Sequence, residues 1–153
     1  MVTHREMQLF LSAYILLEIC EIFTVGGFPL HSSVRRGFTA AHLAMIISTA
    51  WILMMNGAVG YQLIEDGTRT SLGLILGSAA VLFIGTGYIA LDTGFSWTRY
   101  WDDTLDAPNR AYALYTLVFL APLVFLFIFY LLEANLVLRI LGEKVPMSEY
   151  SSA

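Results

Sequence analysis

Residues 71–91 read S-L-G-L-I-L-G-S-A-A-V-L-F-I-G-T-G-Y-I-A-L, and this stretch contains no charged side chain. A helix rises about 1.5 Å per residue, so about 20 residues cross the hydrocarbon core of a bilayer. In lipid, the backbone must satisfy its own hydrogen bonds, which a helix does. The stretch therefore predicts a transmembrane helix, and the rest of the chain is built on the same pattern.

Three other stretches are as long and nearly as apolar. We expect transmembrane helices over residues 7–25, 38–64, 71–91 and 111–138. No repeat or low-complexity linker separates them. The predicted fold is therefore all-α: a polytopic membrane protein in which residues 1–153 form a single transmembrane domain, a bundle of four transmembrane helices. Pro122 lies inside the last span, where its missing N–H predicts a kink.

The composition agrees with a membrane protein. Of the 153 residues, 58% are hydrophobic and 13% charged, whereas a soluble domain carries about 25% charged residues. The net charge is −4 without a basic run, so nucleic-acid binding is not expected. Known catalytic motifs are absent, and His4, His31 and His42 lack metal-ligand spacing. The residues thus indicate no enzyme, no cofactor, no metal site and no soluble substrate; the lipid bilayer is the expected surrounding.

Small residues suggest how two of the spans pack. Ala40, Ala44 and Ser48 fall four apart in the second span, and Gly73 and Gly77 form a G-x-x-x-G motif in the third. Small residues let membrane helices approach closely. We therefore expect both stripes to bring the second and third spans together, while contact of the Gly73 face with a partner stays open as the alternative.

The longest connection runs from Asp92 to Arg110. It carries Trp97, Tyr100 and Trp101 beside several aspartates. Aromatic residues next to a charged stretch are typical of the membrane interface. This connection is predicted to be a short amphipathic segment lying on the membrane surface.

Polar groups inside the spans are the candidates for function, because a carboxylate in a span costs several kcal/mol unless it faces a partner, water or the bundle interior. They are Glu18, Glu21, Asn56 and Glu133, with His42 and Asn135 nearby. Three interpretations remain open. These groups form a structural polar core, or a face that binds another membrane protein, or a path for protons or cations.

The stretch W-I-L-M-M-N-G-A-V-G-Y-Q-L-I-E-D-G-T-R-T-S, residues 51–71, is the most distinctive part of the chain. Its Asn56-Gly57, Gln62-Leu63 and Glu65-Asp66-Gly67-Thr68 resemble the fungal chitin synthase export chaperone family. Further pieces match in order: His4-Arg5-Glu6-Met7, Gly27-Phe28-Pro29, Phe38-Thr39-Ala40, Arg139-Ile140-Leu141-Gly142 and Pro146. The chain matches about the second to fifth spans of a family that looks seven-spanning.

The resemblance implies a protein of the endoplasmic reticulum membrane that takes part in cell wall biogenesis. Such a protein helps a chitin synthase, its membrane protein client, to fold and leave that compartment. It is not itself a catalyst. In the family orientation, both termini and the turn at residues 65–68 face the cytosol.

The turn at residues 65–68 also has a purely structural interpretation. Asp66-Gly67 suits a tight turn, because glycine accepts a positive φ and aspartate bonds nearby amides. Thr68 or Ser71 can cap the helix that follows. Direct contact between this turn and a client is the alternative.

Our leading hypothesis is a membrane chaperone or export factor that holds its client by helix-to-helix contact. A small proton or solute transporter using intramembrane carboxylates is one alternative, and a non-catalytic accessory subunit of a membrane complex is another. The candidate residues for partner binding or a polar structural role are Glu18, Glu21, Asn56, Gln62, Glu65, Asp66, Gly67, Thr68 and Glu133.

Overall fold

The computed structural model describes residues 4–61, 68–101, 110 and 112–144. Within these residues the regular structure is helical, and four stretches are long and apolar enough to cross a membrane. The predicted all-α bundle of four membrane helices is thereby confirmed. The elements are α1 (His4–Val25), α2 (Ser32–Gly60), α3 (Arg69–Phe95), α4 (Tyr112–Tyr115), the π-helical turn η2 (Thr116–Leu120) and α5 (Ala121–Lys144).

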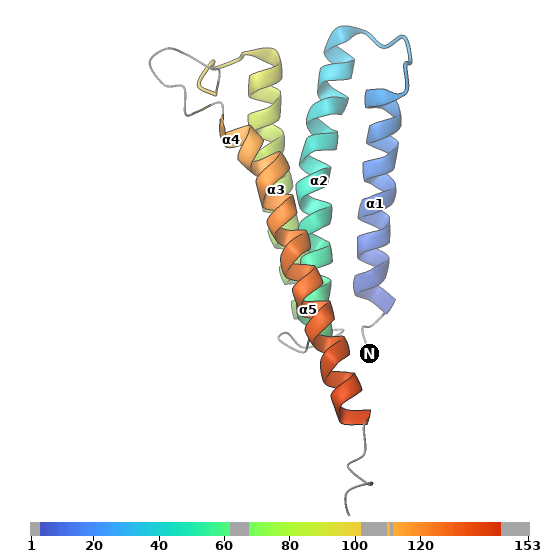
Figure 1. The fold of residues 1–153 in the computed structure, drawn as a ribbon. Helices are drawn as coiled ribbons and strands as arrows, with labels where there is room; N and C mark the ends of the chain where they lie inside the picture. Colours follow the sequence, from blue (N-terminus) through green and yellow to red (C-terminus); the bar gives the residue numbers. More distant parts are fainter. Residues whose placement is uncertain (1–3, 62–67, 102–109, 111, 145–153) are drawn as a thin grey trace, which may run out of the picture.

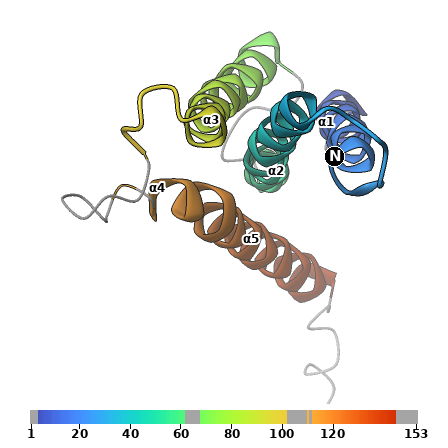
Figure 2. The ribbon, with the colours of Figure 1, turned by 90° about the horizontal axis from the view of Figure 1, so that it is seen from above.

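Helix α2 is the centre of the bundle. Seen from above, α1, α2 and α3 form one row, and α5 runs obliquely along one side of that row (Figure 2). Helix α2 contacts α1, α3 and α5, and it holds the largest buried share of the four spans. From the side, α5 starts near α3 and crosses obliquely past α2 (Figure 1). The position of α2 makes its own residues the ones that join the other helices.

The interface of α2 with α3 rests on small residues of α2. Ala40, Ala44 and Ser48 are all buried, as predicted. The Ser48 hydroxyl lies 2.9 Å from the Ala44 carbonyl oxygen and 3.2 Å from that of Ala79 on α3. A side chain this small brings the backbones close enough for such a contact, which is how membrane helices gain packing energy.

The prediction for the G-x-x-x-G motif is wrong. Gly73 and Gly77 are exposed, and a methyl group added to either would meet nothing within 4 Å. Helix α3 instead turns Ile75 and Ala79 toward the core. Residues two apart on a helix point about 200° apart, so the glycines fall on the far side.

The helices extend past the predicted spans. Helix α2 begins at Ser32, not Phe38, and it includes Arg35 and Arg36; α3 continues to Phe95. The predicted spans end where the first charged residues appear, whereas a helix continues until its terminal backbone groups are capped. The turn before α2 requires glycine: Gly27 has a φ of +64°, a conformation that L side chains rarely adopt.

Pro122 is preceded by a π-helical turn. The Ala121 N–H donates to the carbonyl oxygen of Thr116, five residues back, at the end of η2. Pro122 has no N–H to give, and its ring disfavours the normal turn before it. The irregularity expected at Pro122 therefore takes the form of a wider turn, a common feature of interrupted helices.

Asp92 belongs to α3 and not to the surface segment in which the sequence placed it. It is buried, and its two carboxylate oxygens accept hydrogen bonds from the Thr98 N–H (2.8 Å) and hydroxyl (2.7 Å). Trp97 and Tyr100 are exposed beyond the helix end. Residues 102–109 of the predicted amphipathic segment lie outside the described residues.

Candidate functional site

Glu6, at the start of α1, is fully buried. Its carboxylate oxygen Oε1 lies 3.2 Å from the hydroxyl of Ser71 on α3, which donates to it. Its backbone carbonyl accepts a hydrogen bond of 3.3 Å from the Asn56 side-chain amide on α2. One residue thus links the ends of three helices. Sequence reasoning missed it as a site residue, because Glu6 stands in the polar N-terminal stretch before the apolar span.

Thr68 completes this arrangement at the start of α3. Its hydroxyl oxygen accepts from the Ser71 N–H at 3.1 Å, which confirms the predicted helix cap. The Ser71 hydroxyl also lies 3.0 Å from the Thr68 carbonyl oxygen. The Ser71 hydroxyl has a single proton, which it can donate to the Glu6 carboxylate or to the Thr68 carbonyl oxygen, but not to both at once. We call Glu6, Asn56, Thr68 and Ser71 the Glu6 cluster.

Gly57, next to Asn56, marks the contact of α2 with α5. A methyl group at Gly57 would come within 2.9 Å of the Phe129 ring. Neighbouring residues on a helix point about 100° apart, so Asn56 faces α1 while Gly57 faces α5. The Asn56-Gly57 pair, which was distinctive in the sequence, therefore places the contact of α2 with α1 and its contact with α5 at the same level of α2.

Glu18 and Glu21 lie elsewhere. Both are half-buried. Glu18 lies about 18 Å from Glu6 along the axis of α1. The structure therefore does not bring Glu18 and Glu21 together with Asn56. Within the described residues, no hydrogen bond joins either carboxylate to His42.

The remaining candidates fall into two groups. Glu133 on α5 is half-buried, one turn beyond Phe129, and so stands near the level of Asn56 rather than Glu18. Gln62, Glu65, Asp66 and Gly67 lie outside the described residues.

A groove of about 410 Å³ lies between α1, α2 and α3, on the side of α1 away from Glu18 and Glu21. Leu9, Ala13 and Leu16 line it from α1, with Ile52 of α2 and Ala80 of α3. At 100° per residue, Glu18 and Glu21 fall on the opposite side of Ala13 from Leu9 and Leu16. Helix α1 therefore has an apolar groove on one flank and two carboxylates on the other.

Four membrane-length helices, three of them packed against a central α2 and joined to it or to one another by buried polar contacts, define an integral membrane protein of the polytopic helical class. The chain belongs to the chitin synthase export chaperone family, whose model matches residues 1–153.

Proteins named chitin synthase export chaperone are similar to it along almost its whole length. The protein from Chaetomium globosum is 30% identical over 97% of this chain and 43% of its own. Those from Coccidioides immitis (28%) and Aspergillus fumigatus (29%) each match 95% of this chain and 43% of their own. The chain therefore spans less than half the length of these curated relatives. No solved structure matches it.

Proposed function

We propose that this chain acts in the export of a chitin synthase, by holding membrane spans of that client until they are assembled. The proposal rests on membership of a family named for this task. The observation that carries the mechanism is the pair of half-buried carboxylates, Glu18 and Glu21, inside a span. The role is non-catalytic, and helix-to-helix contact is its physical basis.

The carboxylates favour a protein partner over lipid. An acidic side chain facing hydrocarbon costs several kcal/mol, so it turns to a partner, water or the bundle. Near the end of α1 at Val25, helix α5 lies away on the side of α3 (Figure 1). Within the described residues, Glu21 has no hydrogen bond or ion pair. A client helix with hydrogen-bond donors at the right depth would satisfy both carboxylates.

The place of action that we propose is the endoplasmic reticulum membrane, where an export chaperone meets newly made client. Both termini and residues 65–68 would face the cytosol. The Glu6 cluster then lies near the cytosolic side of the membrane, and Arg35 lies near the lumenal side.

The transporter alternative fits the placement of the carboxylates less well. A proton path needs titratable groups within reach of one another, directly or through water. Glu133 stands near the level of Asn56, about 18 Å along the bundle from Glu18. An accessory subunit differs from a chaperone only in staying with its complex, so the lifetime of client contact separates the two.

The test is co-purification of a chitin synthase with the tagged chain from mild detergent, for the parent and for Glu18→Leu/Glu21→Leu. Loss of the client with unchanged membrane insertion is the expected result. Leu16→Ala, at an exposed position on the groove flank, is the matched control, and it should retain the client.

Undiminished client in the Glu18→Leu/Glu21→Leu variant would overturn the proposed carboxylate face. If the groove variant alone lost the client, the contact surface would be the groove. Asn56→Leu is not a suitable probe, because Asn56 is buried and bonded to Glu6; its change would weaken the fold itself.

A further inference from the structure

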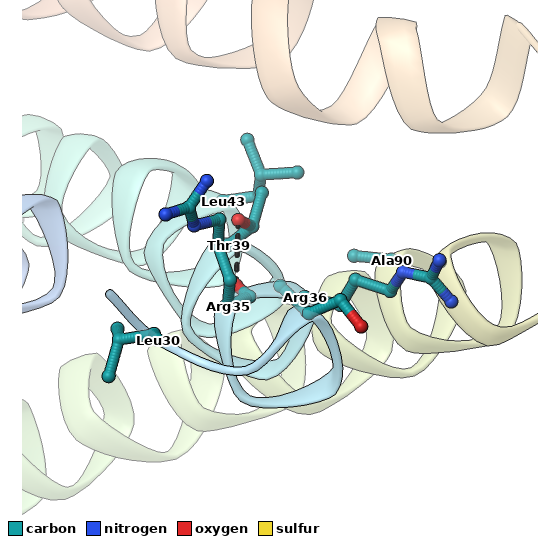
Figure 3. Close-up of a pocket in the computed structure, with 9 residues that line it drawn as sticks. Leu30, Arg35, Arg36, Thr39, Leu43 and Ala90 are labelled. Atoms are coloured by element: carbon teal, nitrogen blue, oxygen red, sulfur yellow. Dashed lines mark hydrogen bonds between the residues drawn. The ribbon is translucent and has the colours of Figure 1, made fainter. Parts of the chain in front are cut away.

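Two arginines line a pocket at the end of the bundle opposite the Glu6 cluster. The pocket holds about 390 Å³ between the start of α2 and the end of α3. Arg35, Arg36 and Thr39 come from α2, and Ala90 and Gly94 come from α3. Figure 3 shows the two guanidinium groups on opposite sides of the pocket, each pointing away from the helix axis.

Uncharged neighbours hold both arginines. The Arg35 guanidinium donates to the Phe28 carbonyl oxygen at 3.1 Å, and Arg36 lies 6.0 Å from the centre of the Phe95 ring. Neither arginine forms an ion pair with a carboxylate in the part of the chain that the structure describes. Asp92, on the same turns of α3, has both oxygens bonded to Thr98. The described residues therefore supply no counter-charge to the two positive charges in this pocket.

The walls of the pocket become apolar toward the middle of the membrane. Ala40 and Leu43 follow the arginines along α2. Leu43 also lines a second pocket of about 320 Å³, with Leu114, Tyr115, Val118 and Phe119 around it. Because both pockets are lined by Leu43, a cationic pocket near the ends of the spans lies next to an apolar pocket beside α4 and η2.

We propose that this paired pocket binds an anionic phospholipid, with its phosphate between Arg35 and Arg36 and an acyl chain along Leu43 toward Phe119. Guanidinium groups form strong charge-assisted hydrogen bonds with phosphate oxygens. Basic pockets between membrane helices are suited to lipid headgroups. A free phosphate would occupy only the cationic pocket and would leave the apolar pocket empty, whereas a phospholipid would fill both pockets.

The experiment is native mass spectrometry of the purified chain, titrated with dioctanoyl phosphatidylglycerol. Dioctanoylglycerol, which lacks the phosphate, and inorganic phosphate, which lacks the chains, are the comparison probes. The parent should bind phosphatidylglycerol at least about tenfold more tightly than either, because the charged bonds and the apolar contact each add affinity.

Arg35→Gln/Arg36→Gln should lose about tenfold in affinity for the lipid, as expected for losing charge-assisted bonds. The matched control is Arg99→Gln/Arg110→Gln, which removes two exposed arginines that do not line the pocket. The pocket arginines are exposed, so their variant should keep its helicity by circular dichroism.

Equal lipid affinity in the parent and the folded Arg35→Gln/Arg36→Gln variant would overturn the site. So would an equal loss in the Arg99→Gln/Arg110→Gln control. Displacement of the lipid by inorganic phosphate at matched concentration would overturn the lipid assignment in favour of a soluble phosphate compound. If the pocket variant unfolds, a Leu43→Trp variant should weaken binding of the lipid, and unchanged binding there would also refute the proposal.

Discussion

The two ends of the bundle differ in whether their main polar side chains are buried with partners inside the chain. At the Glu6 end, where α1 and α3 begin and α2 finishes, a buried carboxylate has its partners within the chain. At the Arg35 end, where α2 begins, both pocket arginines are exposed and Glu21 is half-buried; the exception is Asp92, which is buried and bonded to Thr98. Glu6 and Glu21 are the same residue type on one helix, yet only the first is enclosed. Burial with partners serves stability, whereas incomplete burial leaves a group free to bind something else.

Removal of Glu6 should give the largest effect. Glu6→Ala takes away the acceptor for Ser71 and leaves a cavity in a fully buried position. We expect a loss of about 2–4 kcal/mol in the free energy of unfolding. Titration with SDS in mixed micelles measures it. Glu6→Gln keeps an oxygen acceptor and nearly the same volume, so it should lose less than half as much. Equal losses in both variants would show that the hydrogen bond does not matter.

Gly57 sharpens the comparison through a second contact near the Glu6 end. Gly57→Ala places a methyl group 2.9 Å from the Phe129 ring, so the ring or α5 itself must shift. Overpacking of this kind costs about 1–3 kcal/mol. Gly73→Ala is the matched control, since nothing lies within 4 Å of the added methyl group. The same SDS titration compares the two. A larger loss for Gly73→Ala would contradict the observed face of α3.

The helix cap at Thr68 should give a moderate effect. Thr68→Ala removes the oxygen that accepts from the Ser71 N–H, at a cost of about 1 kcal/mol. Thr68→Ser keeps this oxygen and should be nearly neutral. Thr70→Ala, at an exposed position two residues on, controls for the loss of a threonine. Thermal unfolding followed by circular dichroism would rank these variants, and a similar loss for Thr68→Ala and Thr70→Ala would argue against capping.

The smallest effect on stability is expected from the half-buried carboxylates. Glu18→Leu/Glu21→Leu should change the free energy of unfolding by no more than about 0.5 kcal/mol, because few contacts depend on these groups. The change in client co-purification should be large by comparison. A stability loss as great as that of Glu6→Ala would remove the distinction between the two ends.

The sequence predicts where the helices lie along the chain better than it predicts which of their faces pack together. Span length and hydropathy are properties of one segment at a time, so four spans could be recognised without knowing how they pack. Which face of a helix is buried depends on the other helices. Gly73 and Gly77 show this: their spacing is typical of a packing motif, yet Ile75 and Ala79 occupy the interface.

The candidate site was predicted only in part. Thr68 could be assigned as a cap because capping is local, and Asn56 was recognised as a polar residue in a span. Glu6 was missed because it precedes the apolar run, and only the folded chain places α1 against Ser71. Asp92 was likewise assigned to a surface segment, since its bonds to Thr98 depend on how the chain turns after Phe95.

The wide turn before Pro122 fixes a rotational register. A π-helical turn holds one residue more than an α-helical turn. If the same residues formed a regular α-helix, the extra residue would rotate everything before it by about 100° relative to α5. Tyr115, which lines the apolar pocket beside Leu43, would then point elsewhere while Phe129 stayed against Gly57. The wide turn thus sets the angle between two aromatic surfaces of one membrane span.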